Sequence, residues 1–192
     1  GNKYCLGRRL FELGNQISVC QPSGLRDVAL PFLSALYERT HQTVHLAVLS
    51  GVDVLYLEKI YGHSPAKSPS HVGRRVPAAC SGLGKAMLAF SRPAQVKDVL
   101  AKGLQRRTPY TISVESLFLA ELAEIRRRGV AFDREEVMLG LTCVAAPIMQ
   151  GGCAIAAISV TGPTSWFDPS TYARRVQDAA AAIGQNLTSV SL

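Results

Sequence analysis

The chain has 192 residues, of which 47% are hydrophobic and 18% are charged. This composition excludes a disordered chain, and no apolar run reaches the length of a membrane-spanning helix. The net charge is +7, but the basic residues occur as scattered doublets and one triplet rather than as a dense stripe. We therefore expect one soluble, cytoplasmic domain with a sizeable core and at most a weak attraction to DNA.

The cysteines and histidines form no recognisable cofactor motif. The five cysteines include no C-x-x-C pair, so a disulfide framework is not indicated. His41 and His45 are four residues apart, which would suit a metal ion on a helix. However, Thr43 and Val44 indicate that a strand begins between them, so the helical spacing loses its meaning. We expect neither a metal ion nor a cofactor.

The first half of the chain predicts a helix followed by a hairpin. Apolar residues recur at helical spacing from residue 23 onward, and Pro31 lies inside that pattern. Strands are expected over 43–50 and 54–60, joined by a short turn. Residues 61–77 hold three prolines and two glycines and are expected to form a loop.

The middle of the chain predicts three helices. Ser81 has the character of an N-cap for the first, and Pro93 begins a second that ends near Gly103. Ser113 is the expected cap of a third helix, which ends at Gly129.

Two apolar runs, 142–149 and 153–161, are separated by a Gly-Gly step that predicts a tight turn between antiparallel strands. Asp168 followed by Pro169 then predicts the start of a last helix. This order of helices and hairpins predicts an α+β domain with an antiparallel sheet.

Small polar residues on the predicted central hairpin suggest a pocket. Side chains alternate along a strand, so Ser159 and Thr161 share one face, and Cys143 can lie on the matching face of the partner strand. Asp133 precedes this hairpin in an acidic segment. Hydroxyls, a thiol and a carboxyl can hydrogen-bond a small polar ligand. Alternatively, Cys143 is a core residue, the hydroxyls bond nearby backbone, and Asp133 caps a turn.

Two further segments frame these residues. Glu135 and Glu136 are expected to form a solvated acidic run. The segment Ser81-Gly82-Leu83-Gly84-Lys85 places two glycines at a helix start, where backbone N–H groups favour an anion such as a carboxylate. Tight helix packing through glycine is the alternative for this segment.

Several spaced segments resemble the effector-binding domain of IclR-type transcriptional regulators. They are VHLAVLSGVDVLYLEKI at 44–60, GRRVPAACSGLGKAMLAF at 73–90, RRRGVAFDREE at 126–136, GLTCVAAPI at 140–148 and AIAAISVTGP at 154–163. The resemblance implies a GAF/profilin-like domain with a central antiparallel sheet of about six strands flanked by helices.

The resemblance also implies a function and a set of site residues. Positions matching Gly82, Leu83, Asp133, Cys143, Ser159 and Thr161 line the effector pocket of the family. Their implied partner is a small organic acid or an aromatic effector. Residues 1–22 would form a linker after a winged helix-turn-helix that precedes residue 1, and residues 23–192 would form the effector-binding domain. DNA would be contacted only through that missing helix-turn-helix, and a homodimer or homotetramer is expected.

The chain departs from the family pattern at two positions. Ala79 stands where many members have His, and Leu83 is bulkier than the common Ala. Both residues would make the pocket mouth more apolar and favour an aromatic or longer-chain acid.

Two other functions are the alternatives to this interpretation. A small enzyme acting on a carboxylated substrate would need a nucleophile such as Cys143 or Lys85, but no base and no nucleophile-elbow motif is recognisable in the sequence. A GAF-like sensor of another signalling protein would share the fold. We expect the domain to have no catalytic activity.

Overall fold

The computed structural model describes Arg9, Gly14 and residues 24–63 and 70–190. Most of the predicted linker, residues 1–22, lies outside the described residues. Within the described part, six strands form one antiparallel sheet in the order β3-β2-β1-β6-β5-β4. The strands are β1 (Thr43–Ser50), β2 (Asp53–Ile60), β3 (Arg75–Pro77), β4 (Ala131–Arg134), β5 (Leu141–Gln150) and β6 (Cys153–Pro163). The predicted α+β class with a six-stranded antiparallel sheet is confirmed.

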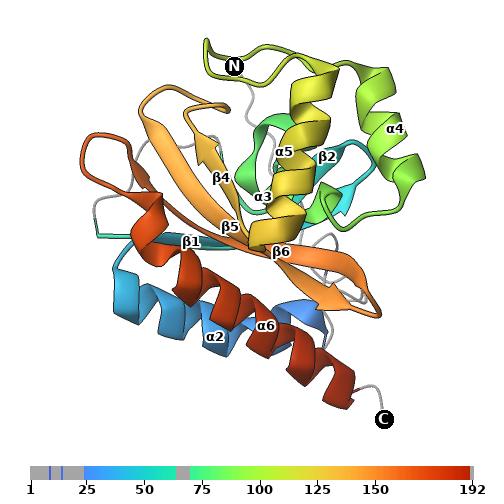
Figure 1. Ribbon diagram of the computed structural model, residues 1–192. Coiled ribbons are helices and arrows are strands. Elements are labelled where there is room, and N and C mark those ends of the chain that lie inside the picture. The colour runs from blue at the N-terminus through green and yellow to red at the C-terminus, as the bar shows by residue number, and fades with distance from the viewer. Residues whose placement is uncertain (1–8, 10–13, 15–23, 64–69, 191–192) are drawn as a thin grey trace.

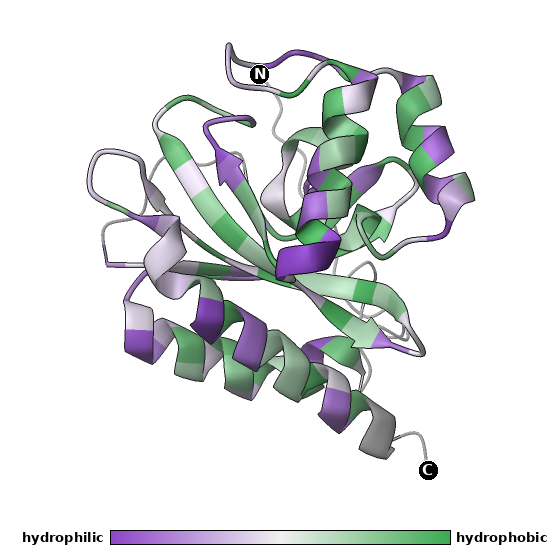
Figure 2. Ribbon diagram, in the orientation of Figure 1, coloured by the Kyte–Doolittle hydropathy of each residue, from purple (hydrophilic) through white to green (hydrophobic). Residues whose placement is uncertain are grey.

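Helices cover both faces of the sheet. One face carries α2 (Leu25–Thr40) and α6 (Ala173–Val190), and the other carries α3 (Gly82–Leu88), α4 (Pro93–Lys102) and α5 (Glu115–Arg128) (Figure 1). Each layer has its own apolar cluster against the sheet, and the strands between them are mainly hydrophobic (Figure 2). None of the described helices is both long and apolar enough to cross a membrane.

The predicted central hairpin is confirmed. Strands β5 and β6 pair over almost their whole length, from Leu141 with Pro163 to Gln150 with Cys153. Gly151 and Gly152 form the turn with φ of 57° and 80°, a backbone conformation that L side chains rarely adopt. The first hairpin, β1 with β2, also lies where its strands were predicted.

Local signals at three element boundaries were misleading. The expected loop 61–77 ends in β3, a strand of three residues that is too short to show an alternating pattern. Val114, not Ser113, occupies the N-cap of α5, and no side chain caps that helix. Asp168 accepts a hydrogen bond from the Ser170 N–H at 2.9 Å, but it opens a 3-10 turn (Pro169–Tyr172) that precedes α6.

The start of α3 is held tightly against the segment before it. The Ser81 hydroxyl accepts a hydrogen bond from the Gly84 N–H at 3.0 Å, which confirms the predicted N-cap. Gly84 itself lies on the backbone of Ala78, since a Cβ at this position would be 2.1 Å from the Ala78 carbonyl oxygen. This packing fixes α3 against the sheet, where its first turn faces β4, β5 and β6.

Candidate functional site

A small cavity lies between the first turn of α3 and the sheet face below it. All six residues predicted for the pocket line this cavity, namely Gly82, Leu83, Asp133, Cys143, Ser159 and Thr161. Its remaining walls are His45, Tyr56, Ser81, Val137 and Leu141. The cavity therefore joins residues from β1, β2, β4, β5 and β6, the start of α3, and the segment between β4 and β5.

Strand register explains why the polar residues converge. Thr161 pairs with Cys143, and Cys143 pairs with Asp133, so the three side chains form a row across β6, β5 and β4. Ser159 lies two residues along the same face of β6 and pairs with His45 of β1. Because cross-strand partners point to the same face, the pairing places all five groups beneath α3.

Gly82 allows α3 to approach this row. A Cβ at Gly82 would lie 2.7 Å from the Cys143 sulfur and 3.5 Å from the Asp133 Cβ. A larger residue here would displace the thiol or fill the cavity. Close backbone approach is therefore a property of this position, as the sequence indicated.

His45 is a pocket residue that the sequence analysis did not identify. Its ring is buried, with Nδ1 3.3 Å from the Ser159 Oγ and 3.5 Å from the Thr161 Oγ1. Its Nε2 lies 2.8 Å from the Ser70 Oγ. Burial, with a smaller effect of the Lys59 charge, lowers the pKa of His45 to about 3, so the imidazole is neutral near pH 7. Only the β1–β6 pairing reveals this role.

The opposite end of the cavity is acidic. Asp133 is 4% exposed, and its Oδ1 accepts a hydrogen bond from the Glu136 N–H at 2.7 Å. Asp133 therefore stabilises a turn, as one of its two alternatives predicted, and its side chain also lines the cavity. Burial, reinforced by the negative charge of Glu136 and opposed by Lys85, raises the pKa of Asp133 to about 7.

The expected solvated acidic run is wrong for Glu136. Its side chain is buried and forms an ion pair with Lys85, which is itself 1% exposed. Glu135 is half-buried. Lys85 projects from α3 across to the segment after β4, and this contact between distant parts of the chain overrides the local polarity of the sequence.

Ala79 does not shape this cavity. It lines a separate hollow with Val52, Pro77 and Val99, so the expectation that it makes the pocket mouth more apolar is wrong. Leu83 does line the cavity and supplies the apolar wall that was expected there.

The lining groups are suited to hydrogen bonding rather than to nucleophilic attack. Burial raises the pKa of the Cys143 thiol, with a further contribution from Asp133, so the thiol stays protonated. Neither lysine nor arginine is among the described residues that line the cavity. Across the described part of the chain, no group of three or more His, Cys, Asp or Glu residues is arranged to hold a metal ion.

The titration of Asp133 leads to a prediction about stability. A raised pKa means that the folded chain binds this proton more tightly than the unfolded chain does. Asp133 should therefore reduce the free energy of unfolding progressively as the pH rises from about 4 to about 7. Asp133→Asn keeps an acceptor for the Glu136 N–H but does not titrate. Its free energy of unfolding, relative to that of the parent, should therefore rise by a few kcal/mol as the pH increases across this window. Urea denaturation of both proteins at pH 4, 5.5, 7 and 8 measures the difference. A difference that does not change with pH would contradict the prediction.

The cavity is small. Only about 20 Å³ is open to the centre of a water molecule, which is room for about one water. An organic ligand therefore requires some of the residues that line the cavity to move.

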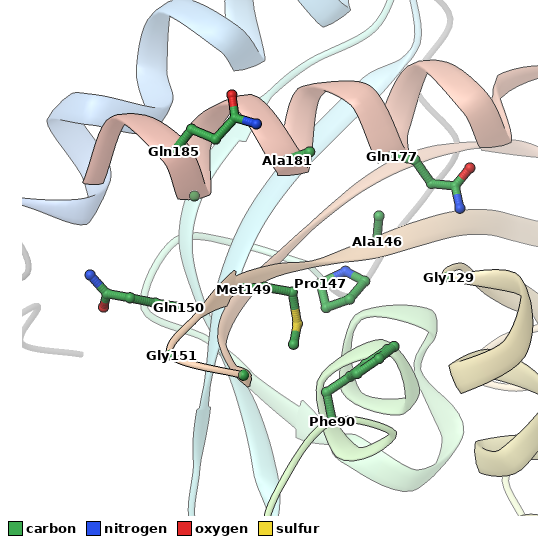
Figure 3. Close-up of a pocket in the computed structure, with 12 residues that line it drawn as sticks. Phe90, Gly129, Ala146, Pro147, Met149, Gln150, Gly151, Gln177, Ala181 and Gln185 are labelled. Atoms are coloured by element: carbon green, nitrogen blue, oxygen red, sulfur yellow. The ribbon is translucent and has the colours of Figure 1, made fainter. Parts of the chain in front are cut away.

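A much larger hollow, about 480 Å³ on the same measure, lies between α6 and the end of β5 (Figure 3). It is open and lined by Phe90, Met149, alanines, glycines and the glutamines Gln150, Gln177 and Gln185, with no ionisable side chain in its lining. The smaller cavity is the better candidate because the buried polar groups converge there.

Known proteins resemble this chain over most of its length. Residues 17–185 match the family described as "Bacterial transcriptional regulator IclR C-terminal". The HTH-type transcriptional regulator XynR of Escherichia coli is 35% identical, over 96% of this chain and 75% of its own length. The chain spans between about half and three quarters of the length of the curated relatives it matches.

Two solved structures with bound acids share the fold. One is an IclR homolog from Microbacterium hydrocarbonoxydans complexed with 4-hydroxybenzoate, at TM-score 0.87 and 30% identity, covering 96% of this chain and 75% of that one. The other is a double mutant of the PobR inducer-binding domain from Acinetobacter with 3-hydroxybenzoic acid, at TM-score 0.72 and 29% identity, covering 82% and 95%. The match over 17–185 and the shared fold show that the chain belongs to the IclR family of transcriptional regulators, and that it contains the C-terminal domain of that family.

Proposed function

We propose that this chain is the effector-sensing part of an IclR-type transcriptional regulator, and that its effector binds in the cavity beneath α3. The observation that carries the proposal is the convergence of Gly82, Leu83, Asp133, Cys143, Ser159 and Thr161 on one cavity. These residues come from four separate elements, and the domain belongs to a family of regulators.

A small aromatic or longer-chain organic acid is the proposed effector. Two relatives of the same fold bind hydroxybenzoates. Apolar walls at Leu83, Val137 and Leu141, with hydroxyl and carboxyl groups between them, suit a ligand with an apolar body and polar ends. Because the cavity is too small for such an acid, binding should select an expanded state of the domain, and that shift is the signal such a sensor transmits.

The proposal includes a partner domain and an assembly. Residues 1–22 would connect the sensor to a winged helix-turn-helix, which would contact DNA in the cytoplasm. The assembly would be a homodimer or homotetramer, since closed symmetric oligomers are the common state of such proteins. No catalysis is proposed, because the protonated Cys143 thiol and the neutral His45 are arranged as hydrogen-bonding groups around a cavity.

A thermal-shift screen of organic acids, including 3- and 4-hydroxybenzoate, tests the proposal directly. A ligand that binds only the folded state should raise the melting temperature with increasing concentration. If a hit is consumed during prolonged incubation with the protein, the enzyme alternative replaces the sensor.

Ser159→Ala should weaken binding of any hit by roughly three- to twelve-fold where the lost hydrogen bond joins neutral groups, and by more where it reaches a ligand carboxylate. Arg127→Ala is the control, because the Arg127 side chain is 76% exposed on α5 and should leave the affinity unchanged. Isothermal titration calorimetry measures both, after circular dichroism confirms that the variants are folded. Equal affinity in Ser159→Ala and the parent would place the binding site elsewhere.

A further inference from the structure

A chain of hydrogen bonds runs from Lys59 on β2 to the cavity. The Lys59 Nζ donates to the Ser70 carbonyl oxygen at 2.8 Å and to the Ser70 Oγ at 3.1 Å. The Ser70 Oγ lies 2.8 Å from the His45 Nε2, and the His45 Nδ1 lies 3.3 Å from the Ser159 Oγ. Ser70 and His45 are both buried, so water does not interrupt the chain between the half-buried ammonium group and the cavity wall.

The charge of Lys59 determines which group donates and which accepts at each step of this series of hydrogen bonds. An ammonium group has donors only, so the Ser70 Oγ accepts from Lys59. The positive potential on that side favours the histidine tautomer whose Nε2 lone pair faces it, with the proton on Nδ1. The Ser70 hydroxyl then donates to Nε2, and the His45 Nδ1–H donates toward Ser159 and Thr161.

Ser159 and Thr161 are thereby left as donors toward the cavity. In this tautomer, each hydroxyl oxygen is an acceptor for the His45 Nδ1–H, at 3.3 Å for Ser159 and 3.5 Å for Thr161, and its own proton is left to donate. Among the described residues, neither hydroxyl has an acceptor for its own proton. At this end of the cavity, a ligand would meet two hydroxyl donors. These donors are linked through His45 and Ser70 to the ammonium group of Lys59.

The end at Asp133 has the opposite polarity. Asp133 lies directly below Gly82, and the nearby ammonium of Lys85 is already paired with Glu136. Two strand spacings, roughly 10 Å, separate Asp133 from Thr161 across the sheet. A ligand carboxylate placed beside Asp133 would face a second acid, whereas at the His45 end it would face donors.

We infer that Lys59, acting through Ser70 and His45, makes the Ser159–Thr161 end of the cavity the carboxylate-binding end. The inference rests on the proposed function and deepens it. The effector is then a hydroxy acid or related acid, bound with its carboxylate toward Ser159 and Thr161 and with a hydrogen-bond donor toward Asp133. Lys59 and Ser70 are positioning residues outside the cavity. This orientation reverses the one suggested by the helix start, where the carboxylate was expected at Gly82 and Leu83.

The state of His45 can be measured without any ligand. In protein labelled with ¹⁵N-histidine, long-range ¹H–¹⁵N correlation spectra distinguish the two neutral tautomers and the imidazolium. The His45 signals are identified by their absence in His45→Gln. We expect the Nδ1–H tautomer in the parent at pH 7, and a larger share of the Nε2–H tautomer in Lys59→Met. An Nε2–H tautomer or an imidazolium in the parent would overturn the proposed direction of the chain.

Paired ligands test the carboxylate end. The probes are 4-hydroxybenzoate and 4-hydroxybenzamide, which differ in charge at one end only, with affinities measured by calorimetry. Lys59→Met should weaken binding of the acid by roughly tenfold and of the amide by less than about twofold. Lys59→Arg should restore most of the acid affinity. Lys97→Met, which removes an exposed lysine of α4, controls for the change in net charge.

The outcomes separate this inference from the proposed function. Equal losses for acid and amide in Lys59→Met would overturn the polarity of the cavity while leaving effector binding intact. If the parent binds neither probe, the aromatic-acid effector fails and the carboxylate assignment falls with it. The tautomer spectrum alone then decides whether Lys59 sets the direction of the chain.

Discussion

Lys85→Met should lower the free energy of unfolding by about 3–5 kcal/mol, the cost of leaving one partner of a buried ion pair unpaired. Lys85 is 1% exposed, and the side chain of Glu136 is 7% exposed. Burial already raises the pKa of Glu136, although Lys85 opposes that shift. The second carboxylate oxygen of Glu136 has no hydrogen-bond partner among the described residues. Without Lys85, therefore, the Glu136 carboxylate would have to be protonated or remain buried and unpaired.

The double variant Lys85→Met/Glu136→Leu is the matched control. It removes both charges and replaces them with apolar groups of similar size, so it should recover most of the lost stability. Urea denaturation, followed by circular dichroism with two-state analysis, gives the three unfolding free energies. A loss of less than about 1 kcal/mol in the single variant would show that the pair contributes little to the fold.

Local patterns predicted the elements that carry strong periodicity. The central hairpin was predictable because its strands are long, apolar and rich in β-branched residues, and because Gly151 and Gly152 mark the turn. By contrast, β3 has three residues, and the cap of α5 depends on where its first turn packs. Neither the short strand nor this cap produces a residue pattern that can be recognised in a short stretch of sequence.

The six residues that line the cavity were predictable from family resemblance, but the buried bonds around the cavity were not. These bonds join residues far apart in the chain, 25 positions between His45 and Ser70 and 51 between Lys85 and Glu136. Sequence alone gives no means of pairing these residues before the sheet register is known. His45 was therefore weighed as a metal ligand and Glu136 as a solvated acid, when both are buried partners beside one cavity.

Gly84→Ala should lower the free energy of unfolding by about 3 kcal/mol or more, although helix propensity predicts the opposite sign. In a solvated helix this change stabilises by about 1 kcal/mol, because alanine loses less backbone freedom on folding. Here the added Cβ would lie 2.1 Å from the Ala78 carbonyl oxygen and 2.4 Å from its Cα. These are backbone atoms of the turn that precedes α3, so they cannot rotate away as a flexible side chain would. Relief of the clash requires α3 to shift from Ala78, and that shift also loosens the cavity roof at Gly82 and Leu83.

Gly140→Ala separates this steric effect from the loss of glycine as such. Gly140 has φ of 78° and no atom within 4 Å of an added Cβ, so its substitution should cost only about 1 kcal/mol of backbone strain. Urea denaturation of the parent and both variants measures the two costs on the same scale. Because the clash at Gly84 arises from packing, a Gly84→Ala protein as stable as the Gly140→Ala protein would mean that α3 can move freely away from Ala78. The same freedom would supply the motion that opens the cavity, and effector affinity should then be nearly unchanged in Gly84→Ala.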